Sequence, residues 1–418
     1  MKLSAFIAVT LSVAAVWAEP TVKDVSLSQD ATTKRVTISY DLSDAPAVVT
    51  AEILLDGVKV DDAVFSTATG DVNRYISVDG VHTLAWQPTK AFANRAGNLT
   101  ARVTAWSPAH PPAYMVVDLS TPTAQRVNYY ASEAGLPGGI GSDVYRQTKL
   151  VLRRIDAKDV TWTKGPEGHT YSVTLDHDYY IGVFEITKAQ WMIIGGSTRS
   201  KLFAVESSMR PMGQVSYVQV RWNGLNTSYG TSGAGWPSAP NANSYLGLLN
   251  SLTGLSFDLP SESEWEFAAR AGHSGNVCGD GSPLTAENLS KFGRFSGNGG
   301  TITAAYNYNE GNDATETWTT DNGSAKVGSY KANDWGLYDM QGNVWELCLG
   351  WWGSDQTDPI TSRPSDPKTP VRGGCYTSNY GDCAVTKRSG LQNCNGNSLA
   401  DLNEKIGFRV TCAVGAVK

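Results

Sequence analysis

A proline-rich break, Ser107-Pro108-Ala109-His110-Pro111-Pro112, separates two regions of this 418-residue chain that differ in pattern. Adjacent prolines remove backbone donors and hold the chain extended, so no helix or central strand is expected to cross the segment. At roughly 100–200 residues per domain, the length also favours two or three domains. We therefore predict a domain boundary here, with residues 107–147 forming a linker and connecting segment.

The region before the break alternates apolar and polar residues with a period of two, most clearly from Val36 to Leu42. Such alternation puts one face of a strand into a core and the other into water. The pair Asp56-Gly57 tolerates the positive φ that a two-residue hairpin turn requires. Short strands with turns and no helical periodicity predict an all-β sandwich of the immunoglobulin or fibronectin type over residues 19–106.

The first 18 residues have the pattern of an export signal. Lys2 supplies the positive end, Leu3 to Val16 is an almost uninterrupted apolar run, and small residues lead to Ala18. A membrane-spanning helix needs about 20 apolar residues, and this run is shorter. We expect residues 1–18 to be a signal peptide that is cleaved after Ala18, so that the mature chain begins at Glu19. We also expect a secreted or periplasmic protein without a membrane span.

Charge excludes two classes of partner. The chain has 34 basic and 40 acidic residues, a net charge of −6, and no cluster of Lys and Arg. Nucleic acid and anionic membranes attract basic patches, so neither is expected as a partner.

All six cysteines lie in the last third of the chain, where export favours disulfides. No two of them form a CxxC motif, which excludes a zinc ribbon, and sequence alone does not choose among the 15 pairings that six cysteines allow. The five histidines are scattered, which argues against a histidine-built metal site. The cysteines are Cys278, Cys348, Cys375, Cys383, Cys394 and Cys412.

Two helix starts stand out in the C-terminal region. Thr187 can cap the helix that begins at Lys188. Ser261 and Glu264 have the spacing of a capping box, in which each side chain satisfies the other's backbone donor. Gly272 is the predicted stop of this second helix.

Four segments then occur in a fixed order: Leu259–Arg270, Gly336–Glu346, Arg372–Gly374 and Gly407–Arg409. Together they resemble the formylglycine-generating enzyme family, also called the sulfatase-modifying factor family, over about residues 148–415. The resemblance implies a C-type-lectin-like α+β fold with little regular secondary structure. We assign this domain to residues 148–418.

The resemblance also implies a structural calcium site. Asp339 and Glu346 lie seven residues apart around Gly342, and calcium prefers six to eight oxygens from mixed sources. On the residues alone, both acids could equally cap turns. The matching family positions ligate calcium through the Asp339 and Glu346 side chains and the Gly342 and Val344 carbonyls.

A second calcium site of the family would fall near Asn307 and Asp321. The spacing match there is loose, and a solvated loop is the simpler interpretation of these residues.

The catalytic prediction depends on the residues after Gly374. Active members of the family hold Cu(I) between the thiolates of a Cys-x4-Cys pair and oxidise a cysteine of a sulfatase peptide to formylglycine. Counted without gaps, the pair falls on Ser378 and Cys383, and a serine hydroxyl is a hard, protonated donor that does not suit Cu(I). A gapped alignment instead places Cys383 on a structural disulfide cysteine of the family, and both catalytic thiols are then missing. Cys375 replaces a family serine, so Cys375 and Cys383 could form a displaced pair; a structural disulfide involving either residue is the simpler interpretation.

We therefore expect an exported binding or structural module, stabilised by calcium, whose protein or glycan ligand the sequence does not identify. The alternative is an active copper-dependent oxidase that modifies exported sulfatases through Cys375 and Cys383. Iron-dependent sulfoxide synthases share this fold but need a histidine cluster that the chain does not show.

Overall fold

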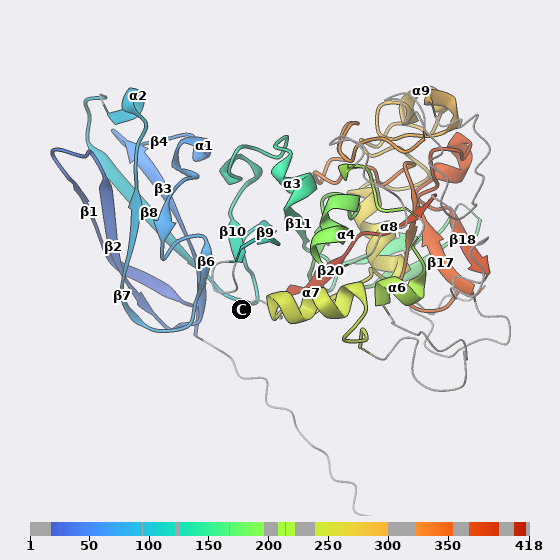
Figure 1. The fold of residues 1–418 in the computed structure, drawn as a ribbon, viewed down its shortest axis with the longest axis horizontal. Coiled ribbons are helices and arrows are strands. Elements are labelled where there is room, and N and C mark those ends of the chain that lie inside the picture. The colour runs from blue at the N-terminus through green and yellow to red at the C-terminus, as the bar shows by residue number, and fades with distance from the viewer. Residues whose placement is uncertain are drawn as a thin grey trace, which may run out of the picture. The chain divides into compact units, whose positions relative to one another are not determined.

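The computed structural model describes ten stretches of the chain: 18–93, 95–121, 126–166, 168–195, 208–213, 215–221, 239–299, 323–353, 368–392 and 405–414. The chain divides into two compact units, one of Met1–Lys59 with Ala68–Ser107 and the other of Val60–Thr67 with Pro108–Lys418. The chain therefore passes three times between the units (Figure 1).

The first unit consists of two antiparallel sheets, which confirms the predicted all-β sandwich. One sheet has the order β1-β2-β7-β5, and in the other β3 pairs with β4, β6 and β8. The strands are β1 (Thr21–Gln29), β2 (Val36–Ser43), β3 (Ala47–Leu55), β4 (Val58–Lys59), β5 (Thr69–Gly70), β6 (Arg74–Ile76), β7 (Gly80–Trp86) and β8 (Leu99–Trp106), with the short helix α2 (Lys90–Ala93) between the last two.

Local sequence explains this sandwich. Along β2, Val36 and Ile38 are fully buried while Thr37 between them is exposed, as the period of two predicts. Asp56 and Gly57 connect β3 to β4 with φ values of 51° and 78°, which is the hairpin geometry expected of Asp-Gly.

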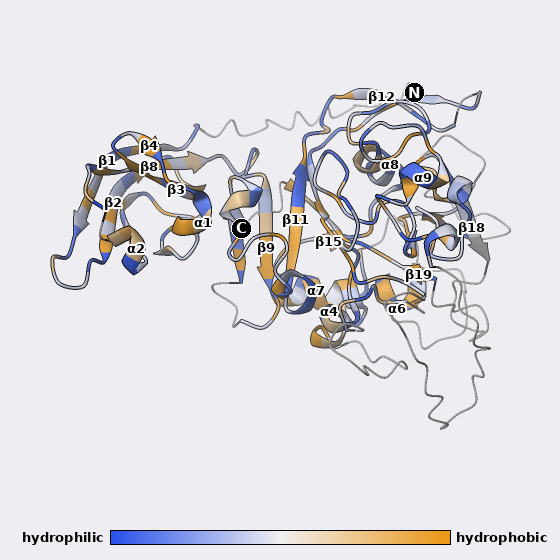
Figure 2. Ribbon diagram, turned by 90° about the horizontal axis from the view of Figure 1, so that it is seen from above, coloured by the Kyte–Doolittle hydropathy of each residue, from blue (hydrophilic) through white to orange (hydrophobic). Residues whose placement is uncertain are grey.

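The second unit is built on a six-stranded sheet with the order β10-β9-β11-β14-β20-β15. Its strands are β9 (Tyr114–Asp118), β10 (Val127–Tyr130), β11 (Lys149–Ile155), β14 (Tyr179–Gly182), β15 (Phe257–Asp258) and β20 (Thr411–Ala413). In Figure 2, β9 is largely hydrophobic, and β11 is hydrophobic over part of its length and hydrophilic toward its end. Two strands of this sheet, β9 and β10, come from residues 107–147, the stretch predicted as a connecting segment.

Two smaller sheets and short helices complete this unit. A four-stranded sheet has the order β18-β17-β16-β19, and β12 pairs with β13. The strands are β12 (Thr161–Lys164), β13 (Tyr171–Thr174), β16 (Trp345–Leu347), β17 (Lys368–Arg372), β18 (Arg388–Gln392) and β19 (Ile406–Gly407). The helices are α1 (Asp62–Phe65), η2 (Glu133–Gly135), α3 (Val144–Gln147), α4 (Lys188–Ile193), α6 (Tyr217–Arg221), α7 (Tyr245–Thr253), α8 (Glu262–Arg270), α9 (Ala286–Leu289), η3 (Ser296–Asn298) and η4 (Tyr380–Cys383).

Both predicted helix starts are confirmed. Thr187 with Gln190 at α4, and Ser261 with Glu264 at α8, form complete capping boxes. Helix α8 ends at Arg270, and Ala271 and the predicted stop Gly272 both have positive φ, at 48° and 87°. The unit has the α+β fold that the family resemblance implies.

No helix in the ten described stretches is long and apolar enough to cross a membrane. The predicted export signal, from Lys2 to Val16, lies outside these stretches.

Candidate functional site

The segment Gly336–Glu346 leads into β16 along a tightly turned backbone. Asp339, Gly342 and Asn343 all have positive φ, at 57°, 96° and 60°. A Cβ on Gly342 would lie 2.3 Å from the carbonyl oxygen of Arg294, so only glycine fits this position. The backbone of the predicted calcium loop is therefore fixed by close packing.

The carboxylate of Glu346 is fully buried and already has strong partners. Arg409 donates to both of its oxygens, from Nε and from Nη2, each at 2.6 Å. The indole nitrogen of Trp265 adds a third donor at 2.7 Å. A bidentate, fully buried guanidinium pair is among the strongest that a carboxylate can make.

Two more carboxylates lie buried near this pair. Asp339 accepts from the backbone N–H of Gly328 at 2.6 Å through Oδ2, while its Oδ1 has no hydrogen-bond partner among the described residues. Glu185 accepts from the Asn343 side chain at 2.6 Å. Burial raises the pKa of Asp339 to about 6, and burial together with the Asp339 and Glu346 charges raises the pKa of Glu185 well above its usual value.

These contacts decide how well calcium fits. The unsatisfied Oδ1 of Asp339 is a suitable ligand oxygen, and the surplus of buried negative charge favours a cation. Glu346, the other predicted carboxylate ligand, would have to leave Arg409 first. No group of three or more acidic, histidine or cysteine side chains in the described stretches converges as a metal site. The residues therefore fit calcium at Asp339, with the Gly342 and Val344 carbonyls as candidate ligands, better than at Glu346.

The candidates for the second calcium site, Asn307 and Asp321, lie outside the described residues, as does Cys394.

The predicted catalytic segment follows β17. Gly373 and Gly374 have φ values of 92° and 77°, and a Cβ on Gly374 would lie 2.6 Å from the sulfur of Cys383. Cys375 Sγ lies 3.4 Å from the hydroxyl oxygen of Ser378, which also accepts from the Cys375 backbone N–H at 3.1 Å. Ser378 thus packs directly beside the Cys375 thiol.

The thiols of this segment are buried. Cys375 is 2% exposed and Cys383 is fully buried. Burial raises the pKa of the Cys383 thiol far above its usual value, and neighbouring Cys375 raises it further. Expected disulfides are not seen for Cys278, Cys375, Cys383 and Cys412, all of which are free thiols.

This arrangement does not fit the copper site of active family members. Ser378 supplies a hydroxyl at the gapless position of the first thiolate, so only Cys383 of that pair offers a sulfur.

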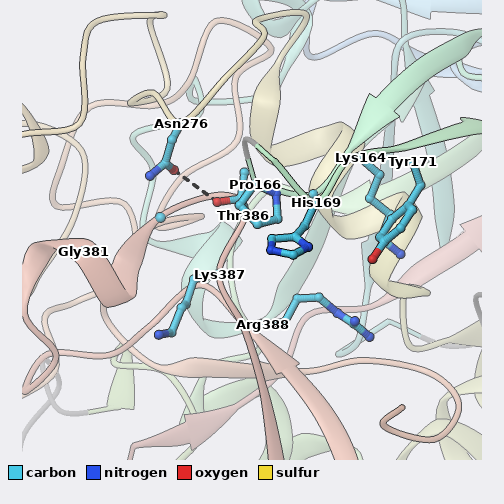
Figure 3. Close-up of a pocket in the computed structure, with 11 residues that line it drawn as sticks. Lys164, Pro166, His169, Tyr171, Asn276, Gly381, Thr386, Lys387 and Arg388 are labelled. Carbon is cyan, nitrogen blue, oxygen red and sulfur yellow. Dashed lines mark hydrogen bonds between the residues drawn. The ribbon is translucent and has the colours of Figure 1, made fainter. Parts of the chain in front are cut away.

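A cavity of about 370 Å³ lies beside the same segment, with Gly381 and Ala384, which flank Cys383 along the chain, in its wall. Its lining includes the basic residues Lys164, Lys387 and Arg388, and His169 lines it as well (Figure 3). Asn276 and Thr386, which form a hydrogen bond of 3.3 Å, line it as well.

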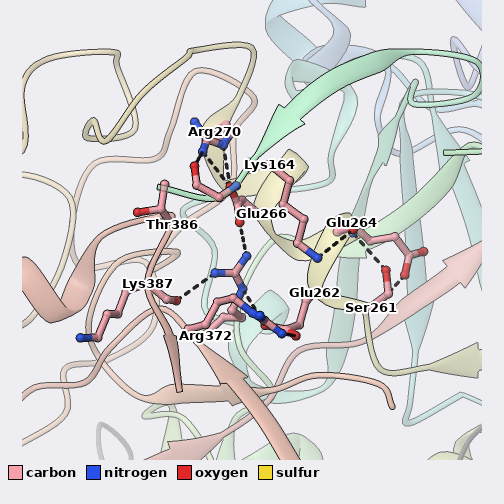
Figure 4. A network of polar contacts seen from close by, with 12 residues as sticks. Lys164, Ser261, Glu262, Glu264, Glu266, Arg270, Arg372, Thr386 and Lys387 are labelled. Atoms are coloured by element: carbon pink, nitrogen blue, oxygen red, sulfur yellow. Dashed lines mark hydrogen bonds and ion pairs between the residues drawn. The ribbon is translucent and has the colours of Figure 1, made fainter. Parts of the chain in front are cut away.

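An ion-pair network anchored on α8 underlies this cavity (Figure 4). Glu266 accepts from Arg270 at 2.7 Å, from Arg372, and from the backbone N–H of Gly165 at 2.9 Å. Although burial alone would raise it, the two arginines hold the pKa of Glu266 below its usual value. Helix α8 therefore holds Gly165, which lines the cavity, and Arg372, which donates to the carbonyl oxygen of the lining residue Lys387.

Sequence reasoning did not find this cavity. Lys164 precedes its partner Ser263 by 99 residues, and Arg388 follows its partner Glu262 by 126. The adjacent pair Lys387-Arg388 after the glycine motif was the one local signal. No spacing rule connects this pair to the hairpin of β12 and β13, which carries Lys164 and lies more than 200 residues earlier.

Comparison with known proteins identifies the second unit. A family profile described as "Sulfatase-modifying factor enzyme 1-like domain" matches residues 141–414. Among curated proteins, the chain is 34% identical over 117 residues to the formylglycine-generating enzyme of Thermomonospora curvata, covering 28% of this chain and 34% of that one. It is 30% identical over 160 residues to the inactive C-alpha-formylglycine-generating enzyme 2 of Bos taurus, covering 38% and 44%.

A third relative has a different name. The chain is 32% identical over 158 residues to serine/threonine-protein kinase pkn1 of Chlamydia pneumoniae, covering 36% of this chain and 20% of the kinase. The chain thus spans less than half the length of each of these three relatives.

Proposed function

The chain belongs to the sulfatase-modifying factor family, and from that premise we propose that its family domain is a calcium-stabilised binding module that does not generate formylglycine. The observation that carries the proposal is the contact of Ser378 with Cys375, at 3.4 Å, beside the fully buried Cys383. Cu(I) needs two soft thiolates, and this loop offers a hydroxyl in place of one of them.

The relatives allow either outcome. One is named a formylglycine-generating enzyme and another an inactive form, and both match this chain at similar identity, 34% and 30%. Family membership alone therefore does not assign activity, and the proposal rests on the residues of the loop.

Calcium is the second element of the proposal. Asp339 would supply its unsatisfied Oδ1, and the Gly342 and Val344 carbonyls are the further ligands that the family resemblance implies. Glu346 would keep Arg409 as its partner. Bound calcium would balance the buried carboxylates of Asp339 and Glu185 and so stabilise the loop that they flank.

Export is the third element. We propose that the mature chain begins at Glu19 and works in a secreted or periplasmic setting, as the pattern from Lys2 to Ala18 indicates. N-terminal sequencing of protein recovered from culture medium or periplasm tests this. Recovery of Met1 on that material would contradict it.

The alternative function is a copper-dependent oxidase that uses Cys375 and Cys383. One observation favours it: the two thiols are neighbours, close enough that Cys375 affects the pKa of Cys383. Burial of both sulfurs and the hydroxyl of Ser378 beside Cys375 weigh against it.

Mass spectrometry of a cysteine-containing sulfatase peptide, incubated with the full chain, Cu(I) and oxygen, separates the two functions. We expect no cysteine-to-aldehyde mass change for the parent chain. If the parent does convert the peptide, and Cys375→Ala or Cys383→Ala abolishes the conversion, the oxidase function is correct. Ser378→Cys, which restores the Cys-x4-Cys spacing, shows whether that one residue accounts for the lost activity.

A further inference from the structure

The cavity beside the Cys383 loop has one-sided charge. Lys164, Lys387 and Arg388 line it together with His169, and no aspartate or glutamate occurs among its described lining residues. This is unusual in a chain whose 40 acidic residues outnumber its 34 basic ones. Basic side chains gathered around a concave surface attract and concentrate anions.

The basic groups are held in position before any ligand arrives. Lys164 is 5% exposed, and its Nζ donates to Ser263 Oγ at 3.0 Å. The guanidinium of Arg388 binds both oxygens of Glu262 and lies over the ring of Trp352 at 4.6 Å. Binding to such a fixed set of donors costs little conformational entropy.

The backbone around the remaining lysine is also fixed. Arg372, itself fully buried, donates to the carbonyl oxygen of Lys387 at 2.9 Å. The Lys387 side chain remains 45% exposed, and its Nζ lies 2.9 Å from Asp382 Oδ1. Lys387 is therefore the basic group of the cavity that can most easily turn toward an incoming anion.

The geometry points to a ligand that carries a tetrahedral oxyanion, and we propose that the cavity binds a phosphate or sulfate group. Glu262 already occupies the fork of Arg388, which leaves lysine ammonium groups to contact an incoming anion. Lysine ammonium groups act as point charges, which suit a tetrahedral anion. The inference names the ligand class of the binding module proposed above and rests on that proposal.

Polar neutral groups complete the lining. Tyr171 carries a phenol hydroxyl, and the hydrogen bond from Thr386 to Asn276 Oδ1 leaves the Asn276 amide NH₂ group as a donor. A cavity of about 370 Å³ holds a small ester together with its oxyanion.

Asp382 makes the proposal unusually testable. Its carboxylate competes with an incoming anion for Lys387, while Asn379 also donates to it at 2.6 Å. Removing the charge of Asp382 should strengthen anion binding, whereas removing the charge of Lys387 should weaken it. A general loss of folding would not produce these opposite changes.

The experiment is isothermal titration of the full chain with inorganic phosphate and, separately, inorganic sulfate, at constant ionic strength with chloride as the reference anion. We expect Lys387→Met to weaken binding about tenfold, as for loss of one charge-assisted contact. Asp382→Asn should tighten it about threefold. Lys331→Met removes an exposed lysine that pairs with Asp280 elsewhere, and should match the parent.

Preference for phosphate or for sulfate in these titrations identifies the ester class. Absence of heat with both anions, or equal affinities for the Lys387→Met and Lys331→Met variants, would overturn the inference. The peptide oxidation assay is read separately: a chain that neither oxidises peptide nor binds anions keeps the proposed function and loses this inference. A chain that oxidises the peptide and binds anions contradicts the proposed function but keeps the anion site.

Discussion

The two units of this protein bury different kinds of side chain. Among described residues of the sandwich, Thr50 is the one polar side chain that is buried, and its core is made of residues such as Ile38 and Trp86. The second unit buries charged side chains completely, among them Glu266, Glu346, Arg372 and Arg409. The comparison teaches that apolar alternation holds the first unit together, while paired charges determine how the loops of the second unit meet.

Breaking a buried ion pair should have the largest effect. Arg409→Met leaves Glu346 charged and buried, and should destabilise the second unit by about 3–5 kcal/mol. The double variant Arg409→Met/Glu346→Met leaves no unpaired charge and should recover most of this loss. Denaturant unfolding, followed as separate transitions of the two units, measures both.

The matched control is the partly exposed Glu52 in the first unit, which pairs with Lys59 at 2.7 Å and with Arg102 at 3.2 Å. Glu52→Gln should change stability by less than about 1 kcal/mol. If the double variant is as unstable as Arg409→Met alone, packing rather than charge pairing holds the two loops.

The corresponding test of the sandwich is a cavity. Ile38 is fully buried on β2, and Ile38→Ala should destabilise the first unit by about 3 kcal/mol, because it removes apolar contacts that the core does not refill. Exposed Thr37, the next residue along the strand, serves as the control, and Thr37→Ala should shift stability by less than about 0.5 kcal/mol. A loss in the second transition as well would show that the two units do not unfold independently.

Calcium should distinguish the units next. At a concentration 100 times its Kd, calcium should stabilise the second unit by about 2.7 kcal/mol through mass action, and leave the sandwich unchanged. Asp339→Asn should remove the response, whereas exposed Asp334→Asn should keep it. Differential scanning calorimetry with calcium and with chelator makes the measurement, and a parent chain that melts identically in both would contradict the calcium proposal.

The smallest effect concerns pH. A hydrogen bond with Glu264, together with Asp176, raises the pKa of His177 to about 9, against the opposing effect of burial. A raised pKa means that the protonated form stabilises the folded state: this stability is complete below about pH 6.5 and is lost as pH rises toward 9.

Because the His177 ring is 44% exposed, we expect only about 1 kcal/mol for this loss after solvent screening. His177→Gln should flatten the stability of the second unit between pH 6.5 and 9. Exposed His110 gives the control variant His110→Gln. Equal pH profiles for His177→Gln and the parent would contradict the prediction.

Sequence predicted those parts of the molecule that depend on near neighbours. The strand of Val36 to Leu42, the Asp56-Gly57 turn and the Ser261 capping box each act over a few residues, and each is confirmed. The ordered glycine-rich motifs predicted the family domain in the same way. These local patterns do not indicate which side chains, distant in the sequence, form ion pairs or hydrogen bonds with one another.

The candidate site was less predictable for that reason. Glu346 was expected to bind calcium, but its partner Arg409 lies 63 residues further on, and a carboxylate carries no local sign of which cation it meets. Likewise, the pairing of Arg372 with Glu266 spans 106 residues, so the cavity above it had no sequence signature. Only the departure at Ser378 could be recognised directly, because it changes the residue type itself.

The segment Val60–Thr67 belongs to the second unit although it lies between two parts of the first, and this limits how the two units can be exchanged between proteins. Helix α1 belongs to that unit, and Asp62 accepts a hydrogen bond of 2.8 Å from Ser132 there. A gene fragment that starts at Pro108 would therefore encode the second unit without the segment Val60–Thr67. The two stretches that form the sandwich are separated in the chain by Val60–Thr67, which belongs to the second unit. Any exchange of the sandwich between proteins therefore has to preserve these eight residues.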